Sequence, residues 1–180
     1  SNGFQSPQTL KALGPRIDAA NIDLKAFNET FYRDVCGARL RPVLRNLVAM
    51  RALGWWLEIT TLLIPGRNDG EAELRALARF IRDELGAETP WHISRFRPEY
   101  RLRDVPPTPT ASLERAWNIG REEGLAYVYV GNLAGHPANS TYCPGCGALF
   151  ARRAGFATRA PGRANCPACG SSATTTPRPT

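Results

Sequence analysis

Apolar residues along the first 130 positions follow two spacings that alternate down the chain. Runs with an apolar residue every three or four positions predict amphipathic helices, and the short apolar-rich runs between them predict strands. Ser6 and Asn28 are N-cap residue types at the start of helical runs, and Gly14 follows the end of one. The pattern predicts helices at 7–13, 28–36, 42–53, 69–85 and 110–123, and strands at 20–24, 56–63, 91–96 and 126–130.

Four strands separated by helices favour an α/β fold with parallel pairing through right-handed crossovers. The strand starts recur about every 35 residues, a spacing typical of the βα units of a barrel or a doubly wound sheet. Four units are about half of an eight-stranded barrel. Because the chain also begins at Ser1 rather than Met, in what reads as the tail of a strand, we interpret residues 1–133 as the C-terminal half of a larger (β/α) barrel.

The composition is that of a globular protein, since 43% of the 180 residues are hydrophobic and no apolar run is long enough to cross a bilayer. The N-terminal residues also lack the charged and apolar regions of a signal peptide. We therefore expect a soluble cytoplasmic protein with no membrane partner. The net charge is +7, but the basic residues are interspersed with Asp and Glu along the helices, which is typical of a solvated surface and disfavours a nucleic-acid partner.

Two Cys-x-x-Cys pairs occur near the end of the chain, in the segments CPGCG and CPACG, with nineteen residues between them. Two such turns present four thiolates to one tetrahedral site, which leaves no open position for a substrate. We predict that one structural metal ion is held by Cys143, Cys146, Cys166 and Cys169. Zinc is the first choice, and iron, which four thiolates also suit, is the alternative.

The composition changes after position 133, where the helix and strand pattern stops. We expect a small rubredoxin-like zinc ribbon over 134–171 and a disordered Ser/Thr/Pro-rich tail over 172–180. Paired thiols that bind metal imply a reducing compartment. The remaining cysteine, Cys36, is expected to be a small buried residue.

The predicted strand at 20–24 carries an Asp-x-Lys sequence with an unusual alternation. A period of two puts Asp23 and Lys25 on one side of the strand and Ile22 and Leu24 on the other. If helices cover the apolar side, the charged side chains face the barrel interior. The alternation alone leaves two interpretations open, an internal ion pair and a pair that receives a charged ligand.

The sequence resembles the radical S-adenosylmethionine (SAM) enzymes related to glycyl-radical activating enzymes, and most closely the radical SAM member of the AmmeMemoRadiSam system. The matching stretches are ANIDLKAF, FYRDVCGARLRPVL, ITTLLIPGRND, TPWHISRFRPEY, DVPPTP, YVYVGNLAGH and NSTYCPGCG, in this order. The resemblance implies a partial (β/α) barrel that holds a [4Fe–4S] cluster and SAM and generates a 5′-deoxyadenosyl radical for hydrogen abstraction. It also implies SAM as a ligand and the other proteins of the AmmeMemoRadiSam system as partners.

The same resemblance implies a set of SAM-binding residues. Asp23 and Lys25 match the pair that lies near the methionyl end of SAM, and Thr60 and His92 are placed with them on the neighbouring strands. Arg97 stands where the activating enzymes bring a histidine to SAM. No catalytic residue is assigned.

The family's cluster motif, three cysteines spaced C-x-x-x-C-x-x-C, is absent from this sequence. We therefore expect the [4Fe–4S] cluster to be held by a missing N-terminal half and this chain to be inactive alone. The alternative hypothesis is a basic zinc-ribbon module on an α/β scaffold that binds nucleic acid. It rests on the arginines between the two cysteine pairs, which are Arg152, Arg153, Arg159 and Arg163.

Overall fold

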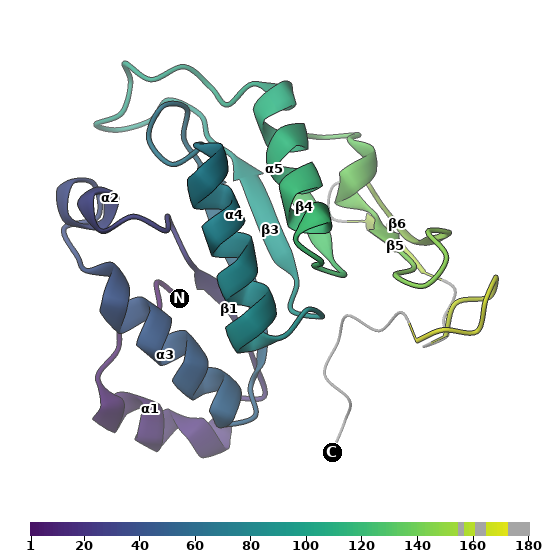
Figure 1. Ribbon diagram of the computed structural model, residues 1–180, viewed down its shortest axis with the longest axis horizontal. Helices are drawn as coiled ribbons and strands as arrows, with labels where there is room; N and C mark the ends of the chain where they lie inside the picture. Colours follow the sequence, from purple (N-terminus) through teal and green to yellow (C-terminus); the bar gives the residue numbers. More distant parts are fainter. Residues whose placement is uncertain (155–156, 161–164, 173–180) are drawn as a thin grey trace.

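Helices and strands alternate along the first 131 residues of the computed structural model, which describes residues 1–154, 157–160 and 165–172 (Figure 1). The helices are α1 (Pro7–Leu13), α2 (Glu29–Asp34), α3 (Leu40–Ala52), α4 (Glu71–Phe80) and α5 (Thr110–Glu122), with single turns η1 (Gly14–Arg16), η2 (Ile81–Leu85) and η3 (Pro137–Asn139). The strands are β1 (Ala19–Asp23), β2 (Trp56–Leu63), β3 (Trp91–Arg95), β4 (Val128–Gly131), β5 (Thr141–Tyr142), β6 (Leu149–Ala154) and β7 (Ala157–Arg159).

The first four strands form one parallel sheet in the order β1-β2-β3-β4. Each strand is joined to the next through a segment that contains a helix, and α3, α4 and α5 lie along one face of the sheet (Figure 1). The predicted α/β fold class with four parallel strands is therefore confirmed.

The predicted start of α4 differs from the structure by two residues. The helix expected from position 69 begins at Glu71, because the preceding side chains serve the loop instead: Asn68 accepts a hydrogen bond from the Ile64 N–H, and Asp69 accepts one from the Gly66 N–H. Asn28 does cap α2 through the N–H groups of the next turn, as its position predicted.

The two faces of the parallel sheet differ in chemistry. The face under the helices is apolar and its central residues are almost completely buried, as Ile22, Ile59 and Trp91 show. The opposite face is polar because successive side chains of a strand point to opposite sides. Its side chains on the four strands are Ala19, Asn21, Asp23, Trp56, Glu58, Thr60, Leu62, His92, Ser94 and Tyr129.

Backbone groups on both outer edges of this sheet form hydrogen bonds to residues outside it. Next to β1, the Ser1 nitrogen donates to the Asn21 carbonyl (2.9 Å) and the Asp23 N–H donates to the Ser1 carbonyl (2.8 Å), which is the bonding pattern of parallel strands. On the outer edge of β4, the Trp117 indole donates to the Val128 carbonyl (2.9 Å). Capped carbonyls of this kind protect an edge against further pairing.

The segment after β4 forms a second, antiparallel sheet in the order β5-β6-β7. It carries both cysteine turns and lies beside α5 and β4 (Figure 1). The division into 1–133, 134–171 and 172–180 stays a prediction, and positions 173–180 of the expected tail lie outside the described residues. Within residues 1–154, 157–160 and 165–172, no helix has both the length and the apolar character needed to cross a membrane.

Helix α5 approaches the sheet most closely at Gly120. A methyl group added there would lie 2.9 Å from Trp91 Cε3 and 2.9 Å from Val128 Cγ2. We expect Gly120→Ala to lower the free energy of unfolding by about 1 kcal/mol in urea denaturation, since the cost of overpacking, about 1–3 kcal/mol, exceeds the gain in helix propensity, about 1 kcal/mol. Asn118→Ala is the control, because this position on the same helix is exposed and its side chain does not pack against the sheet. Equal stability of the two variants would contradict this account of the packing.

Candidate functional site

The two cysteine turns have the same local structure. In the first, the Gly147 N–H donates to the Cys143 carbonyl (2.9 Å), and in the second the Gly170 N–H donates to the Cys166 carbonyl (2.8 Å). Both glycines have φ near +75°, which disfavours any residue with a Cβ atom. Each turn also directs a backbone N–H at its second sulfur, from Ala148 in the first turn and from Ser171 in the second.

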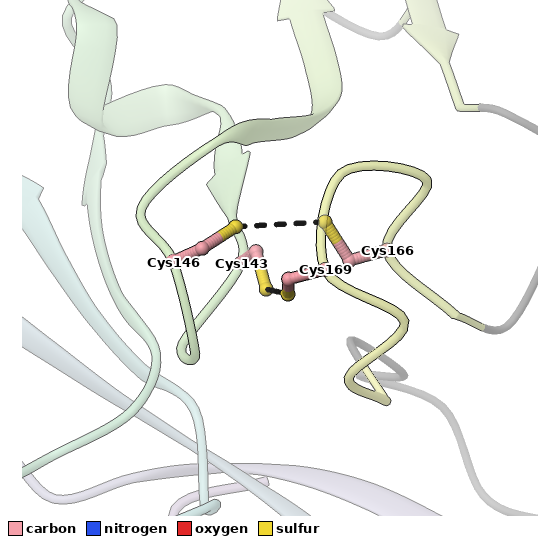
Figure 2. A group of neighbouring side chains, drawn as sticks. All are labelled: Cys143, Cys146, Cys166 and Cys169. Carbon is pink, nitrogen blue, oxygen red and sulfur yellow. Dashed lines mark hydrogen bonds between the residues drawn. The ribbon is translucent and has the colours of Figure 1, made fainter.

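The four sulfur atoms converge on one point between the turns (Figure 2). Cys143 Sγ lies 3.6 Å from Cys169 Sγ, Cys146 Sγ lies 3.7 Å from Cys166 Sγ, and all four lie within 4.8 Å of one another. A tetrahedral ion with metal–sulfur bonds of about 2.3 Å would separate its sulfurs by about 3.8 Å. The predicted four-cysteine group therefore fits a tetrahedral metal ion, and its thiolate donors suit zinc or iron.

Hydrogen bonds in the second turn stabilise the thiolate form of Cys169. The Ser171 hydroxyl and N–H donate to the Cys169 sulfur and lower the pKa of this thiol to about 6. The turns also pack tightly, because a Cβ atom on Gly145 would lie 2.7 Å from Ser171 Oγ. Cys143 and Cys166 are buried while Cys146 and Cys169 are exposed, so an ion would be reached from one side.

The polar face of the parallel sheet carries the other predicted site. Lys25 Nζ lies 2.6 Å from Asp23 Oδ2, and both side chains are a little over one-third exposed. Ile22 and Leu24 are buried on the helix-covered side, as the alternation predicted. Thr60 pairs with Asp23 in register, and its hydroxyl donates to the Asn21 amide oxygen.

Buried polar contacts fix the backbone at Lys25. The Asn68 amide group donates to the Lys25 carbonyl (2.7 Å) and to the Leu62 carbonyl (2.9 Å), while its oxygen accepts from the Ile64 N–H (2.7 Å). The Tyr32 hydroxyl accepts from the Lys25 N–H (3.1 Å). Asn68 is 1% exposed, so these bonds form away from water and hold the ends of β1 and β2 together.

The next strands bring three more groups to the same face. His92 Nε2 lies 3.0 Å from Glu58 Oε2, and this contact holds the pKa of the Glu58 carboxyl below its ordinary value. The His92 ring stacks on the Tyr129 ring with centroids 5.0 Å apart. Tyr129 is buried, which raises the pKa of its phenol, and its hydroxyl lies 3.0 Å from Thr141 Oγ1.

A groove of about 1020 Å³ opens beside these groups, between the ends of β3 and β4 and the β6 strand of the ribbon. Its lining includes the predicted residues His92 and Arg97 but not Asp23, Lys25 or Thr60. The predicted SAM residues thus fall into two groups, a row on β1 and β2 and a pair at the groove. Arg97 itself is exposed.

Sequence reasoning missed several residues that shape this region. Tyr129 was detectable, since alternation along β4 puts it on the same face as His92. Arg153 was assigned only to the nucleic-acid hypothesis, but its guanidinium lies 5.2 Å from the Tyr129 ring and lines the groove. Arg152 and Arg159 are exposed, and Arg163 lies outside the described residues.

Two further side chains of the cysteine and histidine types, Cys36 and His136, take structural roles. Cys36 packs against the core at its margin, and burial raises the pKa of its thiol. His136 accepts a hydrogen bond from the Ala138 N–H at the start of η3 and lies 3.3 Å from Glu114 Oε1. Neither belongs to the four-cysteine group.

Comparison with known proteins gives one uncharacterized relative and two activating enzymes. The chain is 51% identical over 153 residues to an uncharacterized protein, MJ0808, of Methanocaldococcus jannaschii; the match covers 85% of this chain and 45% of that protein. It is 34% identical over 71 residues to the benzylsuccinate synthase activating enzyme of Thauera aromatica, with 39% of this chain and 22% of the enzyme covered. The isethionate sulfite-lyase activating enzyme of Nitratidesulfovibrio vulgaris is 30% identical over 95 residues, 50% of this chain and 31% of the enzyme.

A solved structure shares the fold. A domain of pyruvate-formate lyase-activating enzyme from Bacteroides vulgatus superposes with a TM-score of 0.62 at 16% identity, covering 71% of this chain and 75% of that one. The chain resembles activating enzymes in sequence and in fold. It spans less than half the length of the curated relatives it matches, and no family model matches it.

The four-cysteine group yields a direct prediction of metal content. We expect about one zinc ion per purified chain by elemental analysis, because four cysteine sulfurs already lie in the arrangement of one tetrahedral site. Cys143→Ser should remove most of this metal, whereas Cys36→Ser, which changes the cysteine outside the group, should retain it. A metal-free protein with an intact ribbon would contradict the assignment.

The contacts of Asn68 predict a large loss of stability on truncation. Asn68→Ala leaves two buried carbonyls and the Ile64 N–H without their partner. We expect the free energy of unfolding to fall by about 2–3 kcal/mol in urea denaturation. Asn118→Ala, at an exposed position on α5, is the control and should change stability by no more than about 0.5 kcal/mol. Similar values for both variants would show that the Asn68 bonds are not important for stability.

Proposed function

We propose that this chain forms the SAM-binding part of a radical SAM enzyme of the activating-enzyme kind. The observation that carries the proposal is the Asp23–Lys25 pair, which lies at the carboxyl end of β1 on the polar face of the sheet. Ligand sites of parallel α/β folds are typically found at the carboxyl ends of the strands. The likeness to activating enzymes in sequence and fold supports the same function.

The charges of this pair suit the methionyl end of SAM. That end carries an ammonium group and a carboxylate. The ammonium can donate hydrogen bonds to a protein carboxylate, and the carboxylate can accept hydrogen bonds from a protein ammonium group. Asp23 and Lys25 provide one group of each kind and remain partly accessible. We assign Asp23 to the ammonium and Lys25 to the carboxylate, with Thr60 next to Asp23 in register and with His92 and Arg97 at the groove.

SAM, cleaved beside a reduced [4Fe–4S] cluster, supplies a 5′-deoxyadenosyl radical that abstracts hydrogen. The described cysteines do not fit such a cluster, because four of them close a single-ion site and Cys36 stands apart. The sequence also lacks the C-x-x-x-C-x-x-C motif. The cluster ligands therefore belong outside this chain, which is inactive in SAM cleavage alone.

The ordered sequence stretches described above support a narrower proposal, the radical SAM member of the AmmeMemoRadiSam system, with the other proteins of that system as partners. The four-cysteine site is proposed to be a structural zinc ribbon. The five cysteines, all within the described residues, form no disulfide, which suits the reducing conditions of the cytoplasm, the proposed location.

Removal of either charge should weaken SAM binding. For Asp23→Asn and Lys25→Met we expect the SAM dissociation constant to rise roughly tenfold in titration calorimetry, since each loses one charge-assisted contact of about 1.5 kcal/mol at a partly exposed site. Asp18→Asn and Lys11→Met are matched controls at exposed positions and should bind as the unchanged chain does. If both site variants keep full affinity, the pair is a structural ion pair and the proposal fails.

A further inference from the structure

We propose that the groove between the polar face and the ribbon binds an oxyanion, the carboxylate or phosphate of a second small-molecule ligand, and that Arg153 recognises it. The groove shares His92 and Arg97 with the proposed SAM site, but Asp23, Lys25 and Thr60 do not line it, and Arg153 goes beyond that site. The ribbon would then contribute directly to ligand binding as well as to structure.

The charges of the groove are unbalanced. Three arginines line it, Arg95, Arg97 and Arg153, against the two carboxylates Glu58 and Glu99. Glu58 is already engaged by His92 at 3.0 Å. Across the described part of the chain, none of the three guanidinium groups lies within salt-bridge distance of a carboxylate. Arg153 is close enough to Glu58 to help lower the pKa of that carboxyl, but the lining keeps one more arginine than carboxylates, which favours an anionic ligand.

Arg153 is the arginine held most firmly in this groove. Its backbone N–H donates to Ser140 Oγ (3.2 Å), its guanidinium donates to Thr141 Oγ1, and the same group lies 5.2 Å from the centre of the Tyr129 ring. Of its five side-chain N–H donors, one is used by the Thr141 hydroxyl and a second is directed at the Tyr129 hydroxyl. A preorganised guanidinium with free donors can bind both oxygens of a carboxylate or phosphate at once.

The groove is large enough for more than a free ion. Its volume of about 1020 Å³ falls at the upper end of ordinary small-molecule sites. The half-buried His92 ring, which stacks on the buried Tyr129 ring, lines the groove, so the organic part of a ligand would meet one flat aromatic ring there. An organic carboxylate or a phosphate ester fits this combination.

The position of Arg153 depends on the four-cysteine group. Strand β5 ends at Tyr142, directly before Cys143, and β6 begins two residues after Gly147, so the first cysteine turn connects the two strands. Metal removal should therefore disorder the strand that presents Arg153 and weaken anion binding. Occupancy of the metal site would control the groove through this connection.

The test is a titration of the zinc-loaded chain with inorganic phosphate and, separately, with succinate, followed by amide chemical shifts in NMR. We expect saturable shifts at Tyr129, Asn132 and Arg153 with roughly millimolar affinity. The ion that binds more tightly identifies phosphate or carboxylate as the natural group. No saturable shift with either ion would overturn the proposal.

Matched variants separate the role of Arg153 from that of overall charge. Arg153→Gln should weaken binding of the preferred ion at least about tenfold, and Arg153→Lys, which keeps the charge but loses the planar fork, should weaken it less. Arg152→Gln removes the same charge from the exposed neighbour and should leave binding unchanged. Equal losses in Arg152→Gln and Arg153→Gln would reduce the effect to net charge and refute the assignment.

Zinc content and SAM affinity distinguish loss of the Arg153 side chain from loss of the fold or of the SAM site. Unchanged zinc content in Arg153→Gln would show that the ribbon still folds, so that a loss of binding reflects the missing side chain. SAM affinity, measured on the same variants, tests the Asp23–Lys25 site separately. Loss of anion binding with retained SAM affinity supports the groove proposal, whereas intact anion binding in Arg153→Gln overturns it whatever the SAM result.

Discussion

The in-register parallel pairing of the four strands is the constraint on which the rest of the structure depends. Pairing of Asp23 with Thr60, of Thr60 with His92 and of His92 with Tyr129 puts one side chain from each strand into a single row. A shift of one residue in any strand would turn its polar residues under the helices and its apolar residues outward. The hydrophobic core therefore fixes the polar row, because both are set by the same register.

Buried polar side chains then fix the strand ends, where a parallel sheet presents its site. Asn68 joins the ends of β1 and β2 through Lys25 and Leu62. Thr108 does the same between β2 and β3, as its hydroxyl donates to the Leu63 carbonyl (2.6 Å) and accepts from the Phe96 N–H (2.9 Å). Both side chains are almost fully buried, so their bonds are shielded from competing water.

The ribbon is attached to this sheet at its β4 side through polar and aromatic contacts. The Tyr129 hydroxyl meets Thr141, and the Arg153 guanidinium covers the Tyr129 ring. Burial of Tyr129 under the ribbon explains why its pKa is raised. A site that the first 130 residues form only in part is thus completed by residues from a separate antiparallel sheet.

The sequence alone determined the features that depend on local spacing. The hydrophobic periods predicted the strands and their parallel pairing, the Asp-x-Lys alternation predicted which side of β1 is buried, and the paired cysteines predicted one four-sulfur group. The start of α4 was predicted less accurately, because Asn68 and Asp69 can each cap a helix or bond to a loop N–H. Both bond to the loop here, and the sequence pattern does not distinguish the two roles. The tertiary structure alone decided which distant segments share the groove. Arg153 contacts Tyr129 because the antiparallel sheet packs against β4. Local patterns in the sequence do not determine how two sheets lie relative to each other.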